Sequence, residues 1–283
     1  MVAPVARARE ANMLQRTNPS SGENLPVIGL GTWQSFDVGS SAADRTPLEE
    51  VLRAFVQLGG RVVDSYGRAE GVVGDLVAKL GIRNSLFLAT KVWTTGRNAG
   101  IKSMECSLDL MKAKRMDLMQ VHNLVDVQTH LATLREWKAE GRVRNVGITH
   151  YTGGAHAEVA RLLEREQVDF VQINYSVMER EAEDRVLRMA RDRGVAVIVN
   201  RPLGGGNLFS CVRGKALPGW AKEFDCASWA QFFLKWVVSN PAVTCAIPAT
   251  SNPKHLEDNM QAGFGRLPDE KMRRRMVEAV ATP

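Results

Sequence analysis

Short apolar runs alternate with longer amphipathic segments along most of the chain. The short runs are rich in Val, Ile, Leu and Phe and show little apolar–polar alternation, which is typical of strands buried on both faces of a parallel sheet. We expect eight such strands, at residues 27–30, 61–64, 86–91, 116–122, 143–149, 170–174, 195–200 and 243–247.

The longer segments place apolar residues at helical spacing, and several of them end at a glycine, which is a common helix stop signal. Gly59, Gly81, Gly141 and Gly194 stand at such ends. The expected helices cover residues 47–58, 70–79, 99–111, 129–140, 155–166, 181–193, 228–239 and 253–261, and a further helix is expected at 269–277.

Eight strand–helix units predict a single α/β domain over residues 1–283, a (β/α)8 TIM barrel of parallel strands with surrounding helices. We expect residues 1–12 to form a flexible N-terminal segment and 201–220 a long loop. The alternative, a doubly wound dinucleotide-binding sheet, lacks its G-x-G-x-x-G fingerprint, because the glycine pattern breaks off after Gly31.

Composition narrows the class of protein. The net charge of +6 is spread along the chain without a nucleic-acid-binding motif, so we expect no nucleic-acid partner. Apolar runs fall short of the roughly 18 residues of a membrane helix, and residues 1–12 do not resemble a secretory signal, so we expect a cytoplasmic protein without a membrane partner. A monomer is compatible with this composition. The four widely spaced cysteines predict buried, reduced thiols, and without metal-ligand spacing no metal is expected.

Four polar side chains stand at the predicted carboxyl ends of three consecutive strands, where side chains of a barrel point at its active site. Asp64 and Tyr66 follow the second strand, Lys91 ends the third and His122 ends the fourth. Each has an ordinary alternative, respectively as a helix cap, a loop aromatic, a solvent-reaching lysine and a core histidine. Their coincidence at neighbouring strand ends favours one shared site.

This set of residues suits proton delivery to a carbonyl group. A free tyrosine is a weak acid at neutral pH, and a nearby ammonium, here that of Lys91, is expected to lower the tyrosine pKa. Asp64 can hold that ammonium in place, and a neutral His122 can orient the carbonyl oxygen. Positive charge would then stand where the alkoxide develops.

The sequence resembles the aldo-keto reductase family over nearly its whole length. This resemblance implies NAD(P)H-dependent reduction of a small aldehyde or ketone, or the reverse oxidation, with hydride from the nicotinamide and the proton from Tyr66. The matching segments are VIGLGTW (27–33), VVDS (62–65), YGRAEGVVG (66–74), FLATKV (87–92), LMQVHN (118–123), RVRNVGITHY (142–151), DFVQINYS (169–176), RPLGGG (201–206) and IPATSNPKHLEDN (247–259).

The resemblance also implies where the cofactor lies, with NADPH favoured over NADH. Asn200 stands where the family often stacks an aromatic ring on the nicotinamide. Loops after the last two strands of a barrel commonly bind phosphate, and glycine lets a backbone approach it closely. The implied cofactor residues are Thr149, His150, Gln172 and Asn200 at the nicotinamide, Arg201, Leu203 and Gly204 at the pyrophosphate, Ala249, Thr250, Ser251, Lys254 and His255 at the 2′-phosphate, and Asp258 and Asn259 at the adenine; Trp33 and Trp93 match the walls of the substrate pocket.

One segment departs from the family pattern. A longer segment separates the aspartate from the tyrosine in the family, whereas only Ser65 lies between Asp64 and Tyr66 here. Two explanations compete. Either the numbering runs across a mobile loop, or the chain is truly shorter and Tyr66 is displaced by up to roughly 10 Å of extended backbone.

Two other functions compete with the reductase. The short Asp64–Tyr66 segment and Asn200 are compatible with a catalytically weak, nucleotide-binding barrel that acts as a regulatory or structural subunit. A barrel enzyme of another chemistry, such as an isomerase that uses the phosphate site, would need a catalytic carboxylate at another strand end, and the sequence places none there.

Overall fold

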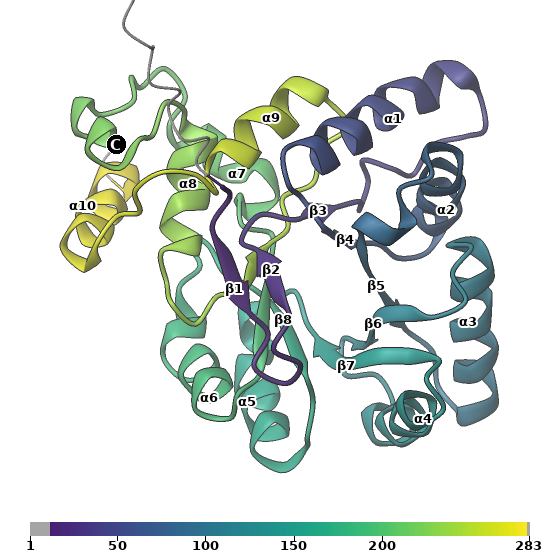
Figure 1. Ribbon diagram of the computed structural model, residues 1–283. Helices are drawn as coiled ribbons and strands as arrows, with labels where there is room; N and C mark the ends of the chain where they lie inside the picture. The colour runs from purple at the N-terminus through teal and green to yellow at the C-terminus, as the bar shows by residue number, and fades with distance from the viewer. Residues whose placement is uncertain (1–11, 282–283) are drawn as a thin grey trace, which may run out of the picture.

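The computed structural model describes residues 12–281 and is a parallel eight-stranded barrel with the helices outside it (Figure 1). Single bridges from Ile28 to Ala246 and from Gly31 to Ala249 join the first barrel strand to the last. The predicted TIM barrel is therefore confirmed. Its strands in spatial order are β3 (Leu30–Gly31), β4 (Val62–Asp64), β5 (Phe87–Val92), β6 (Met116–His122), β7 (Val143–Thr149), β8 (Phe170–Asn174), β9 (Ala196–Asn200) and β10 (Cys245–Ala246).

The glycines of the first barrel strand have a packing role. A side chain at Gly29 would lie 2.8 Å from the carbonyl oxygen of Val62, and one at Gly31 would lie 2.8 Å from that of Ile247. Both distances are shorter than van der Waals contact, so the neighbouring backbones require glycine here. Gly29 and Gly31 therefore allow the close strand packing that closes the barrel.

The helices lie where the pattern predicts them, with three differences. The helix expected at 181–193 begins only at Val186, after a single 3-10 turn at Glu181–Glu183. The first helix begins at Ala42 instead of residue 47, because Ser41 caps it by accepting from the backbone N–H of Asp44, and Pro47 lies inside it. The expected loop 201–220 holds a short helix. The helices are α1 (Ala42–Gln57), α2 (Arg68–Leu80), α3 (Arg97–Leu110), α4 (Val127–Ala139), α5 (His156–Arg165), α6 (Val186–Asp192), α7 (Asn207–Cys211), α8 (Trp229–Val238), α9 (Pro253–Gln261) and α10 (Glu270–Ala281).

The barrel interior is filled by side chains. Phe87 and Phe170 lie across it with their ring centroids 5.7 Å apart. A second and larger apolar layer separates the barrel from the helices. The interior is therefore a packed core, which leaves the two ends of the barrel as its polar surfaces. The interior cluster consists of Leu25, Val62, Phe87, Ala89, Leu118, Phe170, Ala196, Ile198, Cys245 and Ile247.

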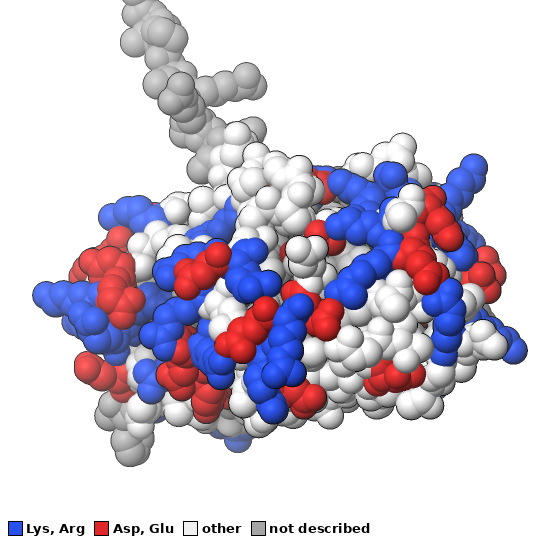
Figure 2. All heavy atoms as spheres, turned by 90° about the horizontal axis from the view of Figure 1, so that it is seen from below, with Lys and Arg blue, Asp and Glu red and all other residues white. Residues whose placement is uncertain are grey.

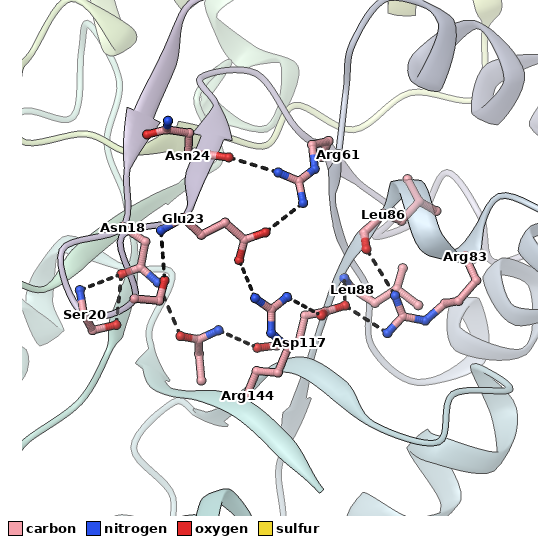
Figure 3. Close-up of polar contacts among 12 residues, drawn as sticks. Asn18, Ser20, Glu23, Asn24, Arg61, Arg83, Leu86, Leu88, Asp117 and Arg144 are labelled. Carbon is pink, nitrogen blue, oxygen red and sulfur yellow. Dashed lines mark hydrogen bonds and ion pairs between the residues drawn. The ribbon is translucent and has the colours of Figure 1, made fainter. Parts of the chain in front are cut away.

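A hairpin of β1 (Gln15–Thr17) and β2 (Asn24–Pro26) precedes the barrel, and the sequence pattern does not predict it. Glu23 in its turn bridges Arg61 and Arg144, both at 2.7 Å, at the amino-terminal side of β4 and β7 (Figure 3). Arg144 and Arg83 also bind the buried Asp117, at 2.9 and 3.0 Å. This charge network, the basal network, occupies the end of the barrel opposite to the predicted active site.

The remaining surface features concern charge and cysteines. On the face seen in Figure 2, basic and acidic side chains are interspersed. The expectation of buried thiols is wrong for half of the cysteines: Cys226 and Cys245 are buried, but Cys106 and Cys211 are exposed, and all four are free.

Between residues 12 and 281, no helix is long and apolar enough to cross a membrane. The predicted flexible segment 1–12 lies, apart from Asn12, outside the described residues.

Candidate active site

The parallel register brings three of the predicted catalytic residues together at one end of the barrel. The ammonium of Lys91 lies 2.6 Å from Oδ2 of Asp64, and both side chains are less than a tenth exposed. In the register of the strands, His122 of β6 stands beside Thr149 of β7, and Thr149 beside Gln172 of β8. The carboxyl ends of β4 to β8 therefore present these side chains to a shared mouth.

Two buried amides support Asp64 from inside the barrel. The Nε2 of Gln120 donates to Asp64 at 3.4 Å and to the side-chain oxygen of Gln172 at 2.8 Å. The Nε2 of Gln172 donates to Asp64 at 3.3 Å. Sequence reasoning missed Gln120, although a glutamine two residues before His122 points to the same face of β6. Gln172, matched to the nicotinamide, is thus already engaged with the aspartate.

Tyr66 reaches the mouth in spite of its short connection. The backbone runs without a break from Asp64 through Ser65 to Tyr66, so the segment is truly shorter and no mobile loop separates them. Lys91 donates to the carbonyl oxygen of Ser65 at 3.1 Å, which holds this segment against β5. The Tyr66 ring lies 5.6 Å from the ring of His122 and 6.1 Å from that of Trp93. The tyrosine is therefore beside the histidine.

His122 is neutral at physiological pH. Burial first, and then the positive charges of Lys91 and His150, lower its pKa to about 4. Its Nδ1 is buried and has no hydrogen-bond partner among the described residues. A neutral imidazole has one N–H donor, as orientation of a carbonyl oxygen requires. The expected protonation state of His122 agrees with this environment.

The expected effect of Lys91 on Tyr66 does not occur in this arrangement. Burial, and then the negative charge of Glu70, raise the pKa of the Tyr66 phenol above its ordinary value. The hydrogen bonds of the Lys91 ammonium go to Asp64 and Ser65. Asp64 therefore offsets much of the positive charge that would stabilise a phenolate.

Aromatic rings rim the mouth. Trp33 and Trp93, predicted as pocket walls, are 66% and 50% exposed, so they border open surface instead of the core. Trp93 meets the His122 ring edge-on at 5.1 Å. Tyr151, which the sequence reasoning missed, lies 6.3 Å from His122 with nearly parallel rings and 5.7 Å from His150. Its position in the segment that follows β7 was the available signal.

Several buried polar atoms at the mouth have no partner among the described residues. They include Oγ1 of Thr149 and Oδ1 of Asn200. The Nδ2 of Asn200 donates to the backbone oxygen of His150 at 3.1 Å, which ties the end of β9 to the residue that follows β7. Since buried polar groups are normally paired, free acceptors here fit a ligand with amide donors. This agrees with a nicotinamide near Thr149 and Asn200.

The glycine loop after β9 is shaped for close approach. Gly204, Gly205 and Gly206 all have positive φ, between 60° and 95°. A side chain at Gly205 would lie 3.3 Å from the Arg201 guanidinium, and α7 begins directly after the loop. Backbone N–H groups in such turns can bind phosphate oxygens, and an arginine beside them adds positive charge. Leu203 precedes this turn and is half-buried.

The residues after β10 divide into two groups. Ala249, Ser251, Lys254 and His255 are exposed, so all four are accessible to a ligand. Asp258 accepts from Ser228 and from Gln231, both at 2.7 Å, and is therefore engaged with the start of α8. The Thr250 hydroxyl accepts from the backbone of Asn252, and Asn259 is buried. Among residues 12–281, no group of His, Cys, Asp or Glu side chains could hold a metal ion.

The chain is similar to known oxidoreductases over most of its length. The model of the Aldo/keto reductase family matches residues 27–275. Methylglyoxal reductase YeaE of Escherichia coli is 28% identical, with 87% of this chain and 89% of that protein covered. NADP-dependent D-sorbitol-6-phosphate dehydrogenase of Malus domestica is 24% identical, with 89% and 90% covered. A solved aldo-keto reductase of Klebsiella pneumoniae in complex with NADPH superposes with a TM-score of 0.78 at 24% identity, covering 96% of this chain and 97% of that one.

Proposed function

Because the chain belongs to the aldo/keto reductase family, we propose that it reduces a small aldehyde or ketone with NADPH and that Tyr66 donates the proton. The observation that carries this proposal is the meeting of Tyr66, His122 and the Lys91–Asp64 pair at one mouth. We also propose that it works in the cytoplasm, where its four free thiols stay reduced.

In the proposed reaction, the neutral His122 donates a hydrogen bond to the carbonyl oxygen and holds it beside the Tyr66 hydroxyl. When bound, NADPH supplies a hydride to the carbonyl carbon. Tyr66 transfers its proton to the oxygen as negative charge develops there, and the Lys91 ammonium, held by Asp64 at 2.6 Å, fixes the Ser65 backbone that carries Tyr66 into the mouth. Trp33 and Trp93 border the carbonyl substrate.

We assign the cofactor contacts to side chains at the mouth whose polar atoms have no hydrogen-bond partner among the described residues or are exposed. Thr149, His150 and Asn200 would hold the nicotinamide amide, supported by Gln172 behind them. Arg201, Leu203 and Gly204 would meet the pyrophosphate, because three consecutive glycines open the backbone there. Ala249, Thr250, Ser251, Lys254 and His255 would surround the 2′-phosphate, and Asp258 and Asn259 the adenine. The D-sorbitol-6-phosphate dehydrogenase relative is named NADP-dependent, which supports NADPH over NADH.

Cofactor titration followed by turnover tests the proposal. NADPH should quench tryptophan fluorescence through Trp93 at the mouth, and an activated aldehyde such as nitrobenzaldehyde should then oxidise the bound NADPH. Tyr66→Phe should lower turnover at least about 100-fold, because the general acid is lost, and leave the Kd of NADPH unchanged. Tyr175→Phe, at a buried tyrosine bound to Glu183 and Arg273, is the matched control and should keep turnover per folded molecule.

The outcomes separate the candidates. Quenching without turnover favours the nucleotide-binding regulatory barrel. Turnover that survives in Tyr66→Phe contradicts the acid assignment. Absence of quenching at millimolar NADPH removes both the reductase and the nucleotide-binding function.

A further inference from the structure

Glu70 is a buried carboxylate beside the candidate active site that the proposed chemistry leaves without a role. It lies in the first turn of α2 and is only 3% exposed. Its carboxylate accepts a hydrogen bond from the Thr90 hydroxyl of β5, and its backbone N–H donates to the carbonyl oxygen of Gly67 at 3.1 Å. The Ser107 hydroxyl of α3 and the backbone of Gly67 also act to lower the pKa of the carboxyl group. Burial outweighs the contributions of its polar neighbours and raises the pKa of the Glu70 carboxyl group above its ordinary value, so its buried charge is costly.

Part of this arrangement is ordinary helix capping. Gly67 is the N-cap residue of α2, and Glu70 stands three residues later. A glutamate at this position commonly reaches back to the N-cap N–H. The capping role does not account for the bond to Thr90, because that residue belongs to another strand.

Two partners of Glu70, Gly67 and Thr90, are the immediate chain neighbours of two catalytic candidates. Gly67 follows Tyr66, and Thr90 precedes Lys91. One residue, bound through its backbone on one side and its carboxylate on the other, therefore joins the short segment that carries the phenol to the strand that carries the ammonium. The short Asp64–Tyr66 connection gives this bond its importance, because the segment has little chain of its own with which to adjust.

We propose that Glu70 is a positioning residue: its backbone bond to Gly67 and its carboxylate bond to Thr90 fix Tyr66 relative to Lys91 so that the phenol stands beside His122. This inference rests on the proposed reductase function. It adds a residue that touches neither substrate nor cofactor.

The charge of Glu70 acts in addition to its hydrogen bonds. Its negative charge, after burial, raises the pKa of Tyr66. The charged groups around Tyr66 and Glu70 are Lys91 on β5, paired with Asp64 of β4, and His122 on β6, which is neutral. Because a phenol of ordinary pKa is already protonated at working pH, this charge does not itself improve Tyr66 as an acid, and the role of Glu70 lies in the contacts that hold the segment in place.

Two hydroxyl variants give a matched comparison. Thr90→Val and Ser107→Ala each remove one donor from the same carboxylate, but only Thr90 adjoins a catalytic residue. We expect Thr90→Val to lower kcat about 10-fold or more, because small misplacements of catalytic groups are costly, while Ser107→Ala keeps kcat within about 2-fold. The Kd of NADPH should stay constant in both variants. Equal losses in the two variants, or no loss in either, would overturn the positioning role.

A spectroscopic titration tests Glu70 without any turnover. The phenolate absorbance of Tyr66 is obtained as the difference between each protein and the same protein carrying Tyr66→Phe. Glu70→Gln keeps the shape and removes the charge, so the Tyr66 titration should move to lower pH, while Glu183→Gln, at a glutamate that binds Tyr175, should leave it in place. An unmoved Tyr66 titration in Glu70→Gln would overturn the inference. If the wild type oxidised no NADPH with a carbonyl substrate, the reductase function would be contradicted instead. The two failures are distinguishable because the absorbance titration needs no turnover.

Discussion

At the residue scale, the environment of His122 makes a prediction about stability and pH. The pKa of His122 is lowered to about 4 in the folded chain, against an ordinary value of about 6.5 in the unfolded chain. Between pH 4 and pH 6.5 the unfolded state therefore binds more protons than the folded state. The contribution of the neutral His122 to the free energy of unfolding is complete above pH 6.5 and is lost as the pH falls toward 4. Because the His122 ring is partly exposed, the expected loss in the free energy of unfolding is reduced to about 2 kcal/mol.

Urea unfolding at a series of pH values measures this contribution. His122→Asn should show a shallower fall in the free energy of unfolding between pH 6.5 and 4 than the wild type. His255→Asn, at an exposed histidine after β10, is the control and should follow the wild-type curve. Identical slopes for His122→Asn and the wild type would show that His122 is not buried in its neutral form.

The same scale shows what sequence can and cannot supply about a site. Asp64, Lys91 and His122 were predictable, because residues at the ends of buried parallel strands converge whatever the details of the loops. The pKa of Tyr66 was not, because its direction depends on where the Lys91 ammonium points and on Glu70, which lies on a neighbouring helix. Gln120 was available from strand alternation but has no titratable group to attract notice.

At the scale of elements, the contact between α2 and α3 makes a prediction about two glycines. A side chain at Gly74 would lie 2.0 Å from the carbonyl oxygen of Leu110, so Gly74→Ala must push the helices apart and should destabilise the fold by about 1–3 kcal/mol. A side chain at Gly71, one turn earlier, would lie 3.5 Å from the Leu110 side chain, which is an ordinary van der Waals contact.

Gly71→Ala is thus the matched control on the same helix. It should leave stability unchanged or raise it by up to about 1 kcal/mol, since alanine favours a helix interior over glycine. Thermal or urea unfolding of both variants provides the measurement. If Gly74→Ala were as stable as Gly71→Ala, the close approach of the two helices would be wrong.

The elements differ in how well the sequence predicts them. The bounds of β6, β7 and β8 agree with the prediction, because each is a mainly apolar, mainly buried segment that ends in a polar residue. β3 and β10 are shorter than predicted, since each makes a ladder of only two residues. The hairpin β1–β2 was missed because its strands are three residues long and mostly polar, and charged contacts with the barrel hold its turn.

At the scale of the whole molecule, the basal network and the active site lie at opposite ends of the barrel. Asp117 is the second residue of β6 and His122 the last, about 16 Å away along the strand. Asp117→Asn should cost about 3 kcal/mol of unfolding free energy, because Arg83 and Arg144 lose their shared buried partner. The Kd of NADPH should not change.

Denaturant unfolding and fluorescence titration of the same variant check both parts of this prediction. Asp192→Asn, which removes an exposed pair with Arg191, should alter stability by less than about 0.5 kcal/mol. A change in NADPH affinity in Asp117→Asn would show that the two ends are coupled.

The basal network also bears on how such a chain can change over generations. Since the charges of the basal network stand at the amino-terminal end of the barrel, loops at the other end can differ in length without breaking these ion pairs. The Asp64–Tyr66 segment at that end is short, and the strands around it pair in a regular parallel register. Changes in the loops at the mouth therefore leave the contacts at the opposite end intact, and new substrate specificities can arise there with little loss of folding stability.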